Sequence, residues 1–238
     1  MRRIATGFAA LLLLALAAPV RGQTPPPAAA GVREFTVDDA WGRDTVQFRT
    51  TAPLEDIVGT TNEVTGYLRA DPKNLAGPGT AARLEVALNM IKTGIEMRDG
   101  HVARALGADT APVAVFTLEK IKSATPSSLE PNVTANVTGE GTLELKGVRK
   151  KVDVGALVTF VPKGGPFNQM RPGNFVKLVA TFDIRLADFG VERKGQVLPL
   201  QVGELAHVTV TVLASDATPE EAKAYRETAV KYMGKPRK

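Results

Sequence analysis

Arg98, Asp99 and His101 form the one dense group of polar residues whose types suit chemistry. An imidazole oriented by a carboxylate can act as a general base if His101 reaches a substrate proton. No nucleophile motif accompanies the group, so we predict no catalytic residue. Two other interpretations remain: Arg98 paired with Asp99 at the end of a helix, and contact of Arg98 and His101 with the polar head of a ligand.

The chain has few residues that could bind a transition metal or carry out thiol chemistry. It contains two histidines, His101 and His207, and no cysteine. Zinc sites draw mainly on histidine and cysteine, and disulfides need cysteine. We therefore predict no metal and no cofactor. His207 is out of phase with the apolar set Val208, Val210 and Val212, so we expect it on the surface.

The first 22 residues have the composition of an export signal. Met1-Arg2-Arg3 is basic, and an apolar run of about 15 residues follows, shorter than the ~20 that a transmembrane helix needs. We predict that residues 1–22 are a signal peptide, cleaved before Gln23, and that the Pro/Ala-rich residues 23–32 are a tether. With no cysteine to carry a lipid anchor, the mature protein is expected to be periplasmic or secreted.

The charge balance gives no reason to expect nucleic acid as a partner. The predicted signal carries Arg2, Arg3 and Arg21 and no acid, which leaves 27 basic against 25 acidic residues elsewhere. Two short basic segments remain, residues 146–151 and residues 235–238. Solvated charge is their plain interpretation, and transient attraction to an anionic membrane surface is the alternative.

Apolar and polar residues alternate with a period of two from Arg33 to Ala214, which is typical of half-buried strands. Turn residues such as Asp71-Pro72, Gly139-Glu140-Gly141 and Lys146-Gly147 separate the runs. The pattern predicts eight or nine strands with short loops, which excludes a parallel α/β sheet and favours an antiparallel barrel or sandwich. About 180 residues is large for one sandwich. We therefore predict an all-β, eight-stranded antiparallel barrel over residues 33–214.

Two segments break the alternation. Residues 99–106 are expected to form a short internal helix capped by Asp99. Thr218, Pro219 and Glu221 form a capping box with proline at the first helical position, which predicts a second helix from Thr218. Residues 215–238 are therefore expected to add a C-terminal helix and a basic tail outside the barrel.

The inward positions of the predicted strands carry mostly small and medium-sized side chains, and only 5% of the chain is aromatic. An eight-stranded barrel has room for filling side chains or for one small ligand, so modest side chains predict a cavity. An alkyl or isoprenoid chain would suit it, at about 0.8 kcal/mol per buried CH₂. A solidly packed core is the alternative. We expect these residues to bind the ligand: Phe48, Val86, Leu88, Met90, Val154, Val158, Phe182 and Val210 along the chain, with Arg98 and His101 at its head.

An ordered set of motifs spans nearly the whole barrel domain. At these motifs the chain resembles the YceI-like family of periplasmic lipid- and polyisoprenoid-binding proteins. Arg43-Asp44 departs from the family, which usually has His-Ser there. The matching segments are Val46-Gln47-Phe48, Gly59 with Gly66, Asp71-Pro72, Ile95 to Val102 with its Arg98-Asp99-Gly100-His101, Pro112 to Phe116, Val137 to Val148, Asp188-Phe189-Gly190 and Val202-Gly203-Glu204-Leu205.

The resemblance implies a lipocalin-like eight-stranded barrel, open at one end, that encloses an isoprenoid or similar lipid without any reaction. With the alternation, it predicts an exported lipid-binding protein that holds a polyisoprenoid or fatty-acyl ligand for transport or sequestration. Two other classes stay open. One is a packed barrel that binds other proteins, through the helix Thr218–Met233. The other is an enzyme that acts on a lipophilic substrate through His101 and Asp99.

Overall fold

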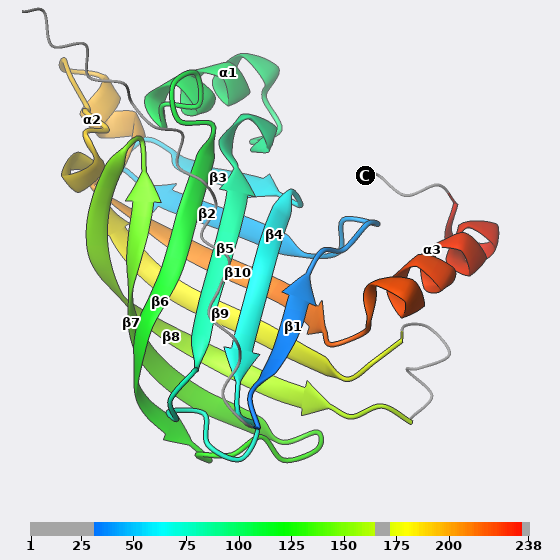
Figure 1. Ribbon diagram of the computed structural model, residues 1–238. Helices are drawn as coiled ribbons and strands as arrows, with labels where there is room; N and C mark the ends of the chain where they lie inside the picture. The colour runs from blue at the N-terminus through cyan, green and yellow to red at the C-terminus, as the bar shows by residue number, and fades with distance from the viewer. Residues whose placement is uncertain (1–30, 165–171, 235–238) are drawn as a thin grey trace, which may run out of the picture.

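Figure 1 presents a computed structural model of the chain, which describes residues 31–164 and 172–234. The predicted signal peptide (residues 1–22), nearly all of the predicted tether (residues 23–32) and the final residues 235–238 of the basic tail lie outside the described residues. None of the helices in the described ranges is both long enough and apolar enough to cross a bilayer.

The described strands form one antiparallel sheet that curls into a barrel (Figure 1). Eight of them close the ring in the order β1-β4-β5-β6-β7-β8-β9-β10, and β10 pairs back with β1 at Thr36 and Ser215. This confirms the predicted eight-stranded antiparallel barrel. The strands are β1 (Arg33–Val37), β2 (Thr45–Thr51), β3 (Asp56–Thr61), β4 (Val64–Ala70), β5 (Ala81–Ala87), β6 (Val113–Thr125), β7 (Thr134–Leu145), β8 (Val148–Val161), β9 (Phe175–Arg185) and β10 (Leu205–Ser215).

The two strands outside the ring, β2 and β3, form a hairpin. β2 pairs with the same edge of β10 as β1 does. β10 pairs with β2 over His207–Thr211 and with β1 at Ser215. Between the two pairings the backbone N–H of Leu213 donates to the buried carboxylate of Asp44 at 2.8 Å. A side chain thus satisfies a strand amide at the point where β10 changes partner.

β7 corrects one of the predicted turns. Gly139-Glu140-Gly141 was expected to be a turn, but β7 runs through it without a break, and every second residue of the strand points inward. The glycines lie in phase with the buried Ala135 and Val137. Lys146-Gly147, in contrast, is a turn as predicted. Both residues have positive φ, 54° and 75°, as a tight two-residue hairpin requires.

The short helices lie at one end of the barrel, where Figure 1 shows α1 and α2 above the strands. The predicted internal helix is present but begins earlier than expected. It starts at Glu96 after the N-cap residue Ile95, and Asp99 lies inside its first turn. The short elements are η1 (Leu88–Met90), α1 (Glu96–Ala105), η3 (Leu186–Phe189) and α2 (Leu198–Gln201).

The opposite end is closed by two loops that bond to each other. The backbone N–H of Leu75 donates to the carbonyl of Ser127, and that of Leu129 donates to the carbonyl of Pro72. Leu75 and Leu129 are both buried and belong to the same apolar cluster as Phe35 and the other side chains of that end. The barrel is therefore plugged at this end by its own leucines.

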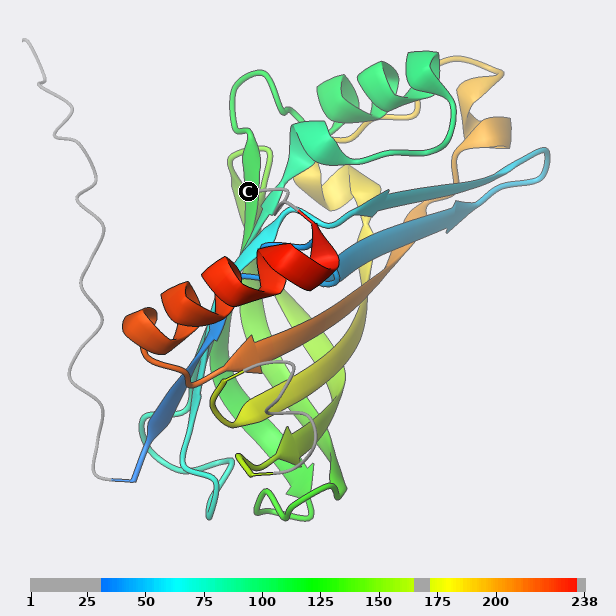
Figure 2. The same cartoon turned by 90° about the vertical axis from the view of Figure 1, so that its right-hand side faces the viewer.

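The predicted C-terminal helix is α3 (Pro219–Met233), which lies along the outside of the barrel (Figure 2). The expected capping box is formed: the Glu221 N–H donates to the Thr218 hydroxyl, and the Thr218 N–H donates to the Glu221 carboxylate. Trp41 packs edge-on against Tyr225 at 5.6 Å. The helix therefore docks on the segment between β1 and β2, beside the point where β10 changes partner.

Candidate ligand-binding site

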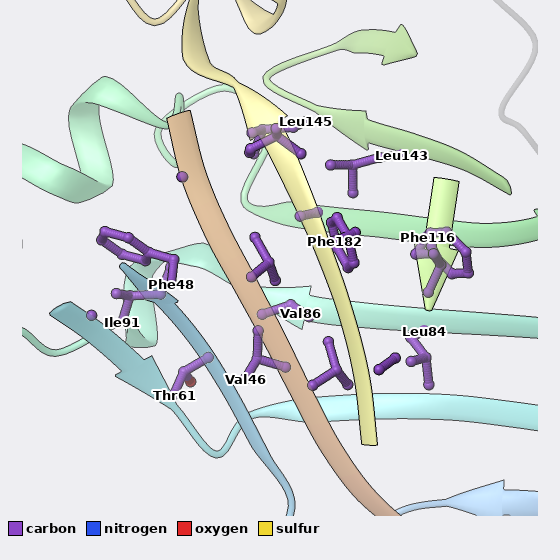
Figure 3. A pocket seen from close by; sticks show the side chains of 18 of the residues that line it. Val46, Phe48, Thr61, Leu84, Val86, Ile91, Phe116, Leu143, Leu145 and Phe182 are labelled. Atoms are coloured by element: carbon purple, nitrogen blue, oxygen red, sulfur yellow. The ribbon is translucent and has the colours of Figure 1, made fainter. Parts of the chain in front are cut away.

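The barrel encloses a cavity of about 720 Å³. This volume lies within the roughly 300–1,000 Å³ typical of small-molecule sites. Apolar side chains line nearly all of it, and all ten strands contribute, because each turns every second side chain inward. Figure 3 shows side chains from several strands that converge on the space. Representative lining residues, one from each strand in order, are Phe35, Phe48, Gly59, Leu68, Leu84, Phe116, Leu143, Val154, Phe182 and Val208.

Of the residues expected at a ligand, all but Met90 line this cavity. Met90 is 45% exposed and points elsewhere. The strand alternation that predicted its direction ends at Ala87, where β5 gives way to η1. A 3₁₀ helix repeats every three residues rather than every two, so only Leu88 keeps the inward direction. The predicted residues found in the lining are Phe48, Val86, Leu88, Arg98, His101, Val154, Val158, Phe182 and Val210.

Sequence reasoning missed the aromatic pair inside the barrel. Phe116 of β6 stacks on Phe182 of β9 with ring centroids 6.1 Å apart, and Figure 3 shows the two rings side by side. The Phe116 ring lies over Gly141 of β7, where a Cβ would stand 2.5 Å from the ring. Gly139 and Gly141 are two residues apart and continue the alternation of the apolar Ala135 and Val137. This spacing was the sequence signal that the two glycines face inward and leave room for an aromatic ring.

Phe48 lies against a glycine near the helical end of the barrel, as Phe116 lies against Gly141. Its ring lies over Gly59 of β3, where a Cβ would stand 2.2 Å from the ring, and Ile91 packs on the same spot. Both glycines therefore make room for an aromatic ring to lie flat against the wall. The cavity is the space that remains beside these rings.

Arg98 brings charge to the helical end of the cavity, but not through the predicted pair with Asp99. Its guanidinium forms an ion pair with Glu55 in the turn between β2 and β3 and donates to the Thr93 hydroxyl at 3.2 Å. Arg98 and Glu55 both line the cavity. The prediction of an Arg98–Asp99 pair is therefore wrong, because the arginine reaches across to another element.

Asp99 instead holds the start of α1. Its carboxylate accepts from the Thr93 N–H and the Thr93 hydroxyl, both at 2.7 Å, and lies 3.5 Å from the Lys92 ammonium. His101 lies on the next turn at the cavity edge and is exposed. No hydrogen bond joins it to Asp99 in the part of the chain that the structure describes. The base and orienter that the enzyme hypothesis needs are not assembled here.

Two hydrogen bonds from Thr93 hold the pKa of Asp99 below its ordinary value of 3.8. The bond from the Thr93 amide has the larger effect, the bond from the Thr93 hydroxyl comes second, and Lys92 adds to both. A carboxyl whose pKa is lowered by folding stabilises the fold above its unfolded pKa, and the contribution is lost as the pH falls through the lowered value. We expect the Thr93–Asp99 link to persist down to pH 3.8 and to open below it. The NMR shift of the Thr93 amide measures this. A midpoint at or above 3.8, or an unchanged titration in Asp99→Asn, would contradict it.

His207 lies outside the barrel, as predicted. It is exposed and pairs with Asp183 on the neighbouring strand β9. Within residues 31–164 and 172–234, no group of three or more histidine, aspartate or glutamate side chains is placed to hold a metal ion. The charged and polar residues of the cavity lining include Arg98, Glu55 and His101 at the helical end and Arg69 and Thr80 toward the plugged end.

The family model described as the YceI-like domain matches residues 35–214, which include nearly the whole barrel. The chain belongs to the YceI-like family. No curated protein matches it. The resemblance at the sequence motifs is thus confirmed by a match over most of the chain.

Several solved structures share the fold at low identity. A polyisoprenoid binding domain from Saccharophagus degradans is 19% identical with a TM-score of 0.57, covering 76% of this chain and 97% of that one. BcnA of Burkholderia cenocepacia is 20% identical with a TM-score of 0.55, covering 75% and 99%. The Campylobacter jejuni YceI protein is 16% identical with a TM-score of 0.51, covering 67% and 85%. These likenesses support the barrel.

The departure of this YceI-like chain at Arg43-Asp44 has a structural role. Asp44 closes the gap in the pairing of β10 described above. Arg43 forms an ion pair with the buried Asp39 at 2.6 Å, and its guanidinium lies 5.8 Å from the centre of the Trp41 ring. The changed pair therefore belongs to the site where α3 docks and not to the cavity.

Proposed function

We propose that this YceI-like protein is an exported lipid-binding protein that holds a long apolar ligand, polyisoprenoid or fatty-acyl, in its barrel for transport or sequestration. The observation that carries the proposal is the 720 Å³ cavity with its apolar lining. Each CH₂ moved from water into such a space contributes about 0.8 kcal/mol. A chain of many such groups would be held firmly without any polar contact.

The extent of the cavity supports a chain-shaped ligand. Its lining reaches from Leu75 and Leu129 at the plugged end to Met97 and Leu198 at the helical end. A space that follows the barrel axis fits an elongated molecule better than a compact one. The S. degradans domain is named for polyisoprenoid binding, which supports the isoprenoid class.

The polar head of the ligand is assigned to the helical end. His101 lines the cavity there and is exposed, and Arg98 stands near it with its charge balanced by Glu55. An uncharged or weakly polar head suits this surrounding better than a strong anion, because the arginine is already paired. The eight apolar side chains predicted to bind the ligand are proposed as its contacts, with the exception of Met90.

The export signal predicted from residues 1–22 supports a periplasmic or secreted protein. A carrier in that compartment would move or sequester a lipid outside the cytoplasm. The proposal includes no chemical step: binding and release of the lipid are the whole activity.

Mass spectrometry of an organic extract tests the proposal. The protein is purified from its own host without detergent, extracted with chloroform and methanol, and compared with an equal amount of protein refolded from denaturant. We expect one class of long-chain lipid in near-equimolar amount from the native sample and none from the refolded one. A native sample without lipid that also takes up no added prenol or fatty acid would overturn the proposal.

A further inference from the structure

Large apolar side chains are exposed at one end of this barrel. Met97 is 73% exposed, Leu54 68% and Val197 61%. Isolated exposed apolar residues are ordinary, but a group of them marks a surface that binds something apolar. We call this group the entrance rim: Leu54, Ile95, Met97, Val197, Leu198 and Leu200.

The entrance rim comes from three segments that are bonded to one another. Leu54 lies in the turn between β2 and β3, and its N–H donates to the carbonyl of Leu200 in α2 at 2.9 Å. The next residue, Glu55, forms the ion pair with Arg98 of α1. The turn therefore stands between the two helices, and Figure 2 shows these elements at the same end of the barrel. The exposed side chains form one surface.

This surface is continuous with the cavity. Ile95, Met97 and Leu198 belong to the entrance rim and also line the cavity. A partner that covers the rim therefore also covers the way into the barrel. On the proposed lipid-binding function, on which this inference rests, that partner must be a phase in which a long apolar chain is soluble.

The charges beside the rim match an uncharged surface. Arg98 pairs with Glu55, Lys92 with Asp99, and Arg193 with Glu204. Charges paired within the protein are less costly to move out of water than single ones. These three pairs balance one another, and Lys146, which lies beside Gly107 at the same end, donates to the Gly190 carbonyl at 2.9 Å.

We propose that the entrance rim docks on the surface of a lipid bilayer, with Leu54, Val197 and Leu200 entering the acyl boundary. A helix or turn with exposed aliphatic side chains binds there in proportion to its buried apolar area. The docked barrel opens onto the bilayer, so its ligand passes between membrane and cavity without crossing water.

Vesicle flotation tests the docking with two matched variants of the full chain. The rim variant carries Leu54→Ser, Val197→Ser and Leu200→Ser, none of which lines the cavity. The control variant carries Val133→Ser, Leu157→Ser and Val230→Ser, three exposed apolar residues on other elements. Both variants replace three exposed aliphatic side chains by serine, and the main difference is where these side chains lie.

We expect the wild type and the control variant to float with phosphatidylcholine vesicles, and the rim variant to bind about a hundredfold more weakly. The rim variant should also take up a fluorescent fatty acid from vesicles about a hundredfold more slowly than the wild type. Its equilibrium binding of the same fatty acid from dilute solution should stay unchanged. If the wild type bound no fatty acid from dilute solution, that result would count against the lipid-binding function and not against the docking.

Three results would overturn the docking. The rim variant could float as well as the wild type. Binding could require phosphatidylglycerol and disappear in 0.5 M salt, which would assign it to the basic segment at residues 146–151. The wild type could be a dimer that only the rim variant breaks, which would make a second copy the occupant.

Discussion

Replacement of Ala156 by tryptophan is expected to abolish tight binding of a long apolar ligand while the barrel still folds. Ala156 lies on β8 with its side chain in the cavity, between Val137 of β7 and Ala180 of β9. An indole there would occupy space that three or four CH₂ groups of a ligand would use. At about 0.8 kcal/mol each, affinity for a fluorescent polyene fatty acid should fall about a hundredfold.

Leu157→Trp is the matched control, because Leu157 is the next residue on the same strand and is 46% exposed on the outer face. It should leave the affinity unchanged. The urea midpoint of each variant checks that overpacking has not unfolded the barrel, since inserted bulk typically costs about 1–3 kcal/mol. Equal affinities for the two variants would place the ligand outside the barrel and remove the basis of the proposed function.

Gly66→Ala is expected to give the largest loss of stability. Gly66 has a φ of 148°, which L side chains rarely adopt, and a Cβ there would stand 2.0 Å from the Arg83 carbonyl oxygen. That oxygen belongs to the backbone of β5, so no side-chain rotation can relieve the contact. The free energy of unfolding should fall by about 3 kcal/mol or more, as measured by urea unfolding.

Gly155→Ala provides the comparison within a strand. Its nearest neighbour to a new Cβ is the Thr181 hydroxyl at 3.9 Å, an ordinary contact. The substitution should raise the free energy of unfolding by about 0.5 kcal/mol, because alanine has fewer unfolded conformations than glycine. If both alanines changed stability by the same amount, the strain at Gly66 would be absent.

Alternation predicted the barrel wall well because the direction of a side chain in a strand depends on local backbone alone. Val154, Val158, Phe182 and Val210 line the cavity for that reason. The same rule gave the wrong direction for Met90, where the strand ends and η1 begins. The residue types do not show where the strand β5 ends and the 3₁₀ helix η1 begins, because Leu88 and Met90 are compatible with both.

Contacts between distant segments were not predictable from one sequence. Arg98 and Glu55 are 43 residues apart, so nothing local favours Glu55 over Asp99 as the arginine's partner. Asp44 bonds a strand amide 169 residues away. For Arg98, the adjacent Asp99 was the partner that the sequence favoured. The glycines of β7 were misassigned for a related reason: glycine favours turns, and only the position of Phe116 explains why Gly141 lies within a strand.

The ring of strands is completed by a pairing of Thr36 with Ser215, residues near the two ends of the barrel domain. The interior therefore does not exist as an enclosed volume until synthesis and folding have reached the last strand. A nascent chain has no compartment in which to trap a molecule. Enclosure of a ligand by the complete ring must therefore follow synthesis of β10.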